Sequence, residues 1–224
     1  MEIWTKDQMA SIHTMLNPKS LAIVGATPRQ QYGGRMLNAA LKMKGRVNVY
    51  AVNPKYDEIL GVKSYKNITE LPETPDVVAV VVPYNYVLDT LKEAHAKGTR
   101  AAIVISAGFS ERGLSDRADL QGEVAKFARE SGLRISGPNC LGLANIRDDI
   151  WLTSSSRGVA GVKGTVGLVC QSGATLFGPF LARAADSGMG LSYVVSTGNE
   201  DTIDELAQVE AKMQELGYGK SLGS

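Results

Sequence analysis

The stretch "SLAIVGATPRQQYGGRMLNAAL", residues 20–41, begins as an apolar run, passes through a turn of small residues and continues with helical periodicity. Gly25 ends the apolar run, and Gly33 and Gly34 precede the helical part. Glycine lets a backbone approach a neighbouring group closely, and the free amides at a helix N-terminus favour an anion. The stretch therefore predicts a strand, a loop and a helix, with glycines that allow tight packing, an anion site, or both. Their spacing is not the Gly-x-Gly-x-x-Gly of a dinucleotide site.

The same alternation of strand and helix recurs along the chain. Further apolar runs rich in β-branched residues lie at 47–52, 77–82, 101–106 and 133–137. Segments of helical periodicity separate them, at 34–44, 86–97 and 117–131. Each of these ends near a glycine that can adopt a left-handed conformation and close the helix. Nearly continuous apolar strands that alternate with helices predict an α/β fold, a Rossmann-like doubly wound parallel sheet.

The ends of the chain add one helix and a second, partial α/β unit. An amphipathic N-terminal helix is predicted with Ile3, Met9, Ile12 and Leu16 on one face. After a stretch rich in Ser and Gly, strands are predicted at 165–171 and 191–197 and helices at 173–187 and 202–216. We expect a first domain over residues 1–150, a linker over 151–164 and a second domain over 165–224.

Composition narrows the classes of partner. The 224 residues carry a net charge of +1 without a basic stripe, which argues against a nucleic-acid partner. No apolar segment is long enough to span a bilayer, so we expect no membrane association. Cys140 and Cys170 form no Cys-x-x-Cys pattern, which argues against a zinc site or other metal site and favours a reducing compartment, the cytoplasm.

The loops that follow the predicted strands gather at one edge of such a sheet, which is where ligands bind. After the second strand, Asn53-Pro54-Lys55 stands where a NAD site has an acidic residue. Lys55 suits a ligand with a phosphate near its ribose, such as NADP or coenzyme A. The alternative is a solvated surface lysine. The loops "SAGFSERG" (106–113) and "GPNCLG" (137–142) end the fourth and fifth strands at the same edge.

Two further features are candidates for chemistry. In "CQSGATLFG", residues 170–178, Ser172 can cap a helix whose first amides, at Gly173 and Ala174, are either an ordinary helix start or an anion site. Cys140 is a candidate nucleophile, but neither His13 nor His95 is placed to activate it. We therefore assign no catalytic residue, and no Walker A loop is found.

Seven segments together identify a family resemblance. They are "SLAIVGAT", "VYAVNPKYDEILGVKSY", "DVVAVVVP", "AAIVISAGFSE", "SGLRISGPNCLGLAN", "VGLVCQSGA" and "VSTGNE". In this order and spacing they resemble the CoA-binding region of the NDP-forming acyl-CoA synthetases. That superfamily includes the ADP-forming acetyl-CoA synthetases and the α subunit of succinyl-CoA synthetase. The resemblance extends over about residues 15–205 and implies that the second unit is a partial flavodoxin-like domain.

The resemblance implies coenzyme A as the cofactor and supplies its site. The residues implied for the cofactor are Gly25, Ala26, Thr27, Gly33, Gly34, Asn53, Lys55, Pro83, Ser106, Ala107, Gly108 and Asn139. The loop from Ala26 to Gly34 and Lys55 would hold CoA phosphates, Pro83 would line the nucleotide, and Asn139 would lie near the thiol. The loop 106–108 would contact the pantetheine arm. Ser172, Gly173 and Ala174 match the helix N-terminus that receives the phosphate of a phosphohistidine.

The reaction of this superfamily passes a phosphoryl group from ATP or GTP to a histidine and then to a carboxylic acid, and the CoA thiol attacks the acyl phosphate. Neither histidine of this chain matches the phosphorylated one, and no ATP-grasp domain is present. We therefore expect the chain to be inactive alone, to bind CoA and a small carboxylic acid, and to need an ATP-grasp partner. An unfinished second sheet further predicts an oligomer. A CoA-sensing or scaffolding module without catalysis and an NADP-dependent reductase stay open as alternatives.

Overall fold

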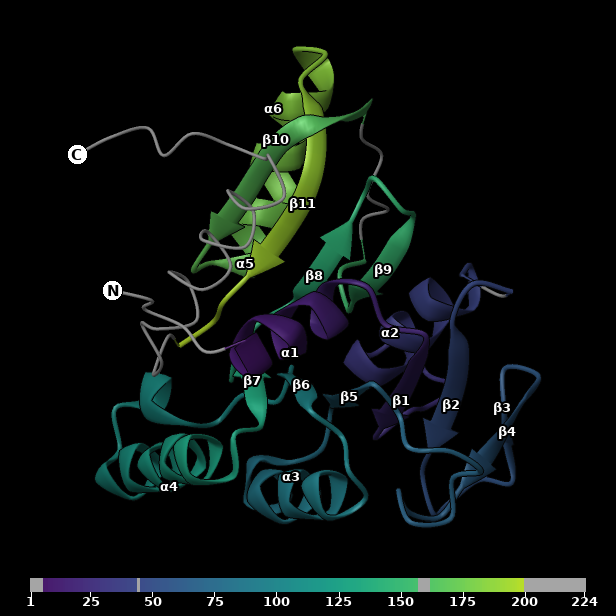
Figure 1. Cartoon of the computed structure of the whole chain (residues 1–224). Helices are drawn as coiled ribbons and strands as arrows, with labels where there is room; N and C mark the ends of the chain where they lie inside the picture. The colour runs from purple at the N-terminus through teal and green to yellow at the C-terminus, as the bar shows by residue number, and fades with distance from the viewer. Residues whose placement is uncertain (1–5, 44, 157–161, 200–224) are drawn as a thin grey trace.

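The computed structural model describes residues 6–43, 45–156 and 162–199 and contains two β-sheets with helices packed on them (Figure 1). The predicted helix over 202–216 and the predicted apolar position Ile3 lie outside the described residues. Within the described part, no helix has the length and apolar character needed to cross a membrane.

The first sheet has seven strands in the order β3-β4-β2-β1-β5-β6-β7. Their bounds are Ser20–Val24 (β1), Asn48–Val52 (β2), Glu58–Ile59 (β3), Val62–Tyr65 (β4), Val77–Val80 (β5), Ala101–Val104 (β6) and Arg134–Ser136 (β7). All pairs are parallel except β3 with β4, which confirms the predicted doubly wound sheet. The β3–β4 hairpin was not predicted. Its two turn residues, Leu60 and Gly61, both have positive φ, as a two-residue hairpin requires.

Helices cover both faces of this sheet (Figure 1). Their bounds are Lys6–Leu16 (α1), Tyr32–Leu41 (α2), Val87–Ala96 (α3) and Ser115–Ser131 (α4). Side chains alternate along a strand, so Leu21 and Ile23 of β1 belong to the core that contains α1 and α2, whereas Ala22 belongs to the core of α3 and α4. The predicted left-handed helix end is confirmed at Gly132, which caps α4 with φ 75°.

The second sheet is mixed and has the order β10-β11-β8-β9. Its strands are Gly142–Asn145 (β8), Ile150–Thr153 (β9), Val162–Cys170 (β10) and Gly190–Ser196 (β11). The two predicted strands are β10 and β11, which pair in parallel, and β8 and β9 join them as an unpredicted antiparallel hairpin. The predicted linker over 151–164 thus contains the end of β9 and the start of β10. The division of the chain into domains at 150 and 164 stays a prediction.

The helix predicted over 173–187 is interrupted. The chain forms α5 over Gly173–Thr175, the π-helical turn η3 over Leu176–Phe180 and α6 over Leu181–Asp186. Gly178 leaves helical geometry at φ −102° and ψ −107°, and Pro179 follows it without an amide hydrogen to donate. A glycine followed by a proline is an established cause of a sharp kink. The prediction of one continuous helix is therefore wrong at its second turn.

The two sheets share one core. Buried Leu143, Leu152 and Tyr193 of the second sheet lie in the same apolar cluster as Leu16 of α1 and Leu37 of α2. Ion pairs add to this packing at the surface: the Asp149 carboxylate lies 2.9 Å from Arg46 and 2.7 Å from Lys163. Hydrogen bonds from these two cations lower the pKa of the Asp149 carboxyl. The helices α1 and α2 are therefore packed between the sheets. This packing sets the position of the two sheets relative to each other, and with it the edge where their loops meet.

Candidate functional site

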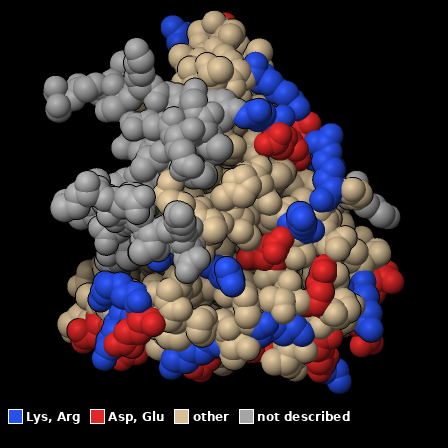
Figure 2. Space-filling model, in the orientation of Figure 1, with Lys and Arg blue, Asp and Glu red and all other residues tan. Residues whose placement is uncertain are grey.

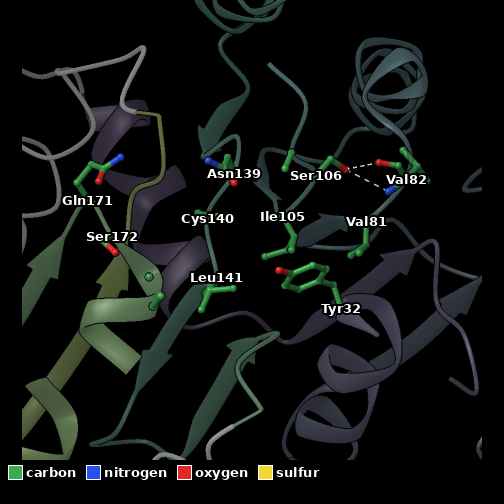
Figure 3. Close-up of a pocket in the computed structure, with 13 residues that line it drawn as sticks. Tyr32, Val81, Val82, Ile105, Ser106, Asn139, Cys140, Leu141, Gln171 and Ser172 are labelled. Atoms are coloured by element: carbon green, nitrogen blue, oxygen red, sulfur yellow. Dashed lines mark hydrogen bonds between the residues drawn. The ribbon is translucent and has the colours of Figure 1, made fainter. Parts of the chain in front are cut away.

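A cavity of about 440 Å³ lies where the carboxyl ends of strands from both sheets meet (Figure 3). It is lined by Tyr32, Val81, Val82, Ile105, Ser106, Ala107, Asn139, Cys140, Leu141, Gln171, Ser172, Gly173 and Ala174. These residues follow β1, β5, β6, β7 and β10. The neighbours β1 and β5 are the strands at which the order of the first sheet reverses, which is the place where doubly wound sheets bind ligands.

The glycines of the loop after β1 are required for close packing. Gly25 has φ +92°, and a Cβ atom there would collide with the carbonyl oxygen of Val81. A Cβ atom on Gly33 would collide with the carbonyl oxygen of Gly25. On Gly34 it would collide with the carbonyl oxygen of Arg29. The tight-packing interpretation of these glycines is confirmed.

The geometry of the same loop is compatible with the predicted anion site. The helix α2 begins at Tyr32, and its N-cap residue Gln31 makes no side-chain hydrogen bond to the first-turn amides. Ala26 is buried, whereas Thr27 is partly exposed beside this helix start. First-turn amides without a capping side chain attract negative charge. That Gly25, Ala26, Thr27, Gly33 and Gly34 hold CoA phosphates stays a prediction.

Asn53 ties this loop to the next one. Its Nδ2 donates to the carbonyl oxygen of Ala26 at 2.8 Å, and its Oδ1 accepts from the amide of Lys55 at 3.0 Å. The Lys55 side chain is exposed. None of the ion pairs found among the described residues involves its ammonium group. Asn53 therefore orients the loop, and Lys55 presents a cation beside it.

The loop after β6 is held by side-chain hydrogen bonds to the backbone. The buried Ser106 hydroxyl donates to the carbonyl oxygen of Val82 at 2.6 Å and accepts from its amide at 3.1 Å (Figure 3). A Cβ atom on Gly108, at φ +109°, would lie 3.0 Å from the ring of Tyr84. These contacts hold the loop in a position where Ser106 and Ala107 line the cavity. Gly108 lines an adjoining cavity of about 620 Å³ that shares Ala107 and Asn139 with the first.

Asn139 and Asn199 join the two sheets at the cavity rim. Asn139 has a positive φ of 58°, and its Nδ2 donates to Asn199 Oδ1 at 3.1 Å. Asn199 Nδ2 in turn donates to Glu111 at 2.6 Å and to Gln121 at 2.8 Å. The amide of Asn199 donates to the carbonyl oxygen of Pro138 at 2.9 Å. Hydrogen bonds therefore hold the loop after β11 against the loop after β6, the loop after β7 and the helix α4.

Glu111 is the charged member of this network. Burial of its carboxylate opposes ionisation, but hydrogen bonds from the Asn199 side chain and from the amides of Gly108 and Phe109 outweigh it and lower the pKa. Sequence reasoning did not select Glu111 or Asn199. The polar residues in "SAGFSE" and "VSTGNE" were the available signal, but the pairing of these loops becomes visible only in the fold.

The predicted helix cap at Ser172 is confirmed. Its Oγ accepts from the amide of Thr175 at 3.3 Å, so the hydroxyl serves the helix start itself. A Cβ atom on Gly173 would lie 2.7 Å from the side chains of Leu141 and Ser196, so only glycine lets α5 approach both. Ala174 is exposed and lines the cavity. The phosphate-binding function of Ser172, Gly173 and Ala174 stays a prediction.

The remaining candidates lie away from the cavity or are used in packing. Pro83 is exposed and is the N-cap of the short 3-10 helix η1, Tyr84–Tyr86. Cys140 is buried, and its thiol donates to the carbonyl oxygen of Val104 at 3.4 Å. His13 is exposed on α1, and the His95 ring packs edge-on against Phe127 at 5.9 Å. Neither histidine lines the cavity.

A family described as "CoA binding domain" matches residues 19–146, which is more than half of the 224 residues. The chain belongs to the CoA binding domain family. A second family, "Succinyl-CoA ligase like flavodoxin domain", matches residues 163–215. The two matches follow each other along the chain in the order of the two sheets. They confirm the predicted resemblance to the NDP-forming acyl-CoA synthetases and the predicted pairing of a Rossmann-like with a flavodoxin-like fold.

Relatives and a solved structure agree with this assignment. The chain is 40% identical over 194 residues to trans-feruloyl-CoA synthase from an unidentified prokaryote, covering 84% of the chain and 27% of that protein. It is 33% identical over 201 residues to the α subunit of ADP-forming acetate–CoA ligase II of Pyrococcus furiosus, covering 89% and 43%. An acetyl-coenzyme A synthetase of Ca. Korarchaeum cryptofilum has a TM-score of 0.78 at 30% identity, covering 88% and 42%. The chain thus spans less than half of each.

Sequence reasoning selected none of the large apolar residues that line the cavity, which are Tyr32, Val81, Val82, Ile105 and Leu141. Tyr32 belongs to the quoted stretch 20–41, but a single tyrosine among glycines carried no signal for a site. It is the first residue of α2, and its side chain is 50% exposed. In Figure 3 its ring lies beside Ile105 and Val81, with the hydroxyl directed toward Leu141.

Proposed function

We propose that this chain is the CoA-holding part of an ADP-forming acyl-CoA synthetase. One observation carries the proposal: the loops of the CoA binding domain and the capped first turn of α5 line the same cavity. One side of the cavity can therefore hold the thiol end of CoA, and the other an anionic acyl phosphate. A site that bound only CoA, or only an acyl phosphate, would not need loops from both sheets.

The chemistry that fits this arrangement is thioester formation. The CoA sulfur attacks the carbonyl carbon of an acyl phosphate, a carbon–sulfur bond forms, the carbon–oxygen bond to phosphate breaks, and the thiol loses its proton. The amides of Gly173 and Ala174 would stabilise the leaving phosphate, because a helix start carries positive partial charge. Asn139 would orient the thiol end, and Asn199 holds Asn139.

The phosphoryl-carrying histidine must come from outside the described residues. His13 and His95 are the two histidines of the sequence, and neither reaches the cavity. A partner chain or a further domain would supply the histidine together with the nucleotide-binding ATP-grasp unit. The α-subunit relative supports this division of labour, since its printed name describes one subunit of an acetate–CoA ligase. We infer a small carboxylic acid as the second ligand and an assembly of more than one chain or domain.

The distribution of charge on the surface also supports a small-molecule ligand. Basic and acidic side chains are interspersed on the face seen in Figure 2, which gives a nucleic acid no extended basic track. We also propose a cytoplasmic location, because the chain has two cysteines, Cys140 and Cys170, without the spacing of a disulfide framework.

Calorimetry with CoA, 3′-dephospho-CoA and NADP tests the proposal. We expect CoA to bind most tightly and Lys55→Ala to weaken its binding about tenfold, because one charge-assisted contact to a phosphate is lost. Lys126→Ala is the matched control: its exposed ammonium group lies on α4 and pairs with Glu130. Tighter binding of NADP than of CoA, or an unchanged CoA affinity in Lys55→Ala, would contradict the proposal.

A CoA-sensing module without catalysis is the second candidate. The absence of a histidine among the cavity residues favours it as much as it favours a missing partner. Mixing the chain with a histidine-bearing chain and an ATP-grasp chain distinguishes the two. Release of ADP that depends on both CoA and an acid supports the synthetase, whereas CoA binding without such turnover supports the sensor.

A further inference from the structure

The cavity has a chemically divided lining. Apolar side chains from both sheets form one wall, contributed by Tyr32, Val81, Ile105 and Leu141 (Figure 3). On the other side, Gln171 and Ser172 contribute polar groups to the lining. A carboxylic acid whose carboxyl group faces this polar side would therefore direct its side chain along the apolar wall.

The cavity has a size that suits a small-molecule ligand. Its volume of about 440 Å³ lies within the range of ligand pockets in proteins, about 300–1,000 Å³. The side chains of its apolar wall gain nothing from contact with water, so a ligand with an apolar group would be favoured there.

Tyr32 is the part of the apolar wall with free aromatic surface. Its side chain is 50% exposed, although its neighbours Ala26 and Gly33 are buried. The guanidinium group of Arg35, one turn further along α2, lies 4.9 Å from the ring centroid and supports the ring. The ring is thus held at the start of α2 with a surface available to a ligand.

We propose that the cavity selects a carboxylic acid with an aromatic or similarly flat apolar side chain, which packs against Tyr32, in preference to acetate. This inference rests on the proposed CoA function and assigns its acyl class. Aromatic pairs gain affinity beyond the area that they bury, and a pocket of this kind discriminates mainly through the apolar contact that a small acyl group leaves unmade.

Binding of CoA thioesters tests the acyl class without needing a partner chain. We compare CoA, acetyl-CoA and benzoyl-CoA by calorimetry on the chain itself. We expect benzoyl-CoA to bind at least about fivefold more tightly than acetyl-CoA. Tyr32→Ala should bring the ratio of the two dissociation constants close to one, and Tyr32→Phe should preserve it because the ring remains. Phe180→Ala is the control, since Phe180 is 49% exposed on η3 and does not line the cavity.

Each result has a distinct meaning. Equal affinities for acetyl-CoA and benzoyl-CoA, with CoA itself bound, overturn the acyl class and leave the CoA function standing. An unchanged ratio in Tyr32→Ala overturns the role of Tyr32 as its determinant. Failure of all three compounds to bind overturns the proposed CoA function and this inference with it.

Discussion

At the scale of single residues, glycine positions carry the most information about the site. Gly25 has a positive φ and lies against the backbone of Val81, so both its conformation and its surroundings exclude a side chain. Gly122, by contrast, lies exposed inside α4, where a Cβ atom would have no neighbour within 4 Å, and there glycine only weakens the helix. The same substitution should therefore have opposite effects at the two positions.

Gly25→Ala should lower the free energy of unfolding by about 2–4 kcal/mol, because left-handed backbone strain and overpacking add. Gly122→Ala should raise it by about 0.5–1 kcal/mol, because alanine favours helix. Urea unfolding of both variants measures these changes. A loss in both variants, or in neither, would show that the close approach at Gly25 does not determine stability.

Residue identity predicted some contacts and could not predict others. The quoted stretch predicts the glycine loop because glycine has few other reasons to recur before a helix. That Asn53 binds the cofactor stays a prediction. Its side chain also joins two loops, a role that the sequence could not show because it depends on a contact between residues 27 positions apart. Tyr32 gave no signal and Asn199 only the polar character of its loop, because an aromatic or an amide residue near a helix start or in a loop is common and acquires meaning only through its neighbours.

At the scale of elements, the loop 106–113 is held in part by a titratable group. The Glu111 carboxylate accepts hydrogen bonds from the amide of Phe109 and the side chain of Asn199, which lowers its pKa. A lowered pKa in the folded state means that ionised Glu111 stabilises the fold. This stabilisation is complete above the ordinary value of 4.5 and is lost as the pH falls through the folded-state pKa.

Glu111→Gln should lower stability by at most about 1 kcal/mol at neutral pH, because solvent screens a group that is partly exposed. The difference from the unmodified chain should shrink as the pH falls below the ordinary carboxyl range. Urea unfolding at several pH values checks this. Glu130→Gln is the control, since that exposed carboxylate lies 3.9 Å from Lys126 and a change of less than about 0.5 kcal/mol is expected. A pH-independent loss in Glu111→Gln would mean that shape, not charge, holds the loop.

Elements with a strong periodicity were predictable, and short or composite ones were not. The central strands β1, β5 and β6 of the first sheet have nearly continuous apolar runs, so their pattern is clear without tertiary context. The β8–β9 hairpin consists of two four-residue strands, and β8 contains a glycine and an asparagine that strands disfavour. Their position is set by pairing of β8 with β11, a contact that local sequence does not encode.

At the scale of the whole molecule, the two sheets behave as one packed body. Their shared core includes α1 and α2, and the Asn145 side chain, fully buried on β8, donates to the carbonyl oxygen of Leu16 at 3.2 Å. The cavity is bounded by both sheets, so its dimensions depend on this packing. The sequence predicts two units but not their shared core, because an apolar face in a sequence does not indicate which other element it packs against.

This packing predicts a single cooperative unfolding transition for the described part of the chain. Leu152 on β9 is fully buried in the shared core, so Leu152→Ala should lower the free energy of unfolding by about 2–5 kcal/mol through lost contacts and a cavity. Met189→Ala, at a side chain that is 42% exposed in the same half of the molecule, should change it by less than about 0.5 kcal/mol.

Tryptophan fluorescence and far-ultraviolet circular dichroism, followed in the same urea titration, distinguish one body from two. If the shared core couples the sheets, both signals change together, and Leu152→Ala moves both midpoints by the same amount. Two separated transitions, of which Leu152→Ala moves only one, would mean that the halves unfold independently. The cavity between them would then vary in width, and a variable cavity could not maintain the selection between acyl groups that Tyr32 is proposed to provide.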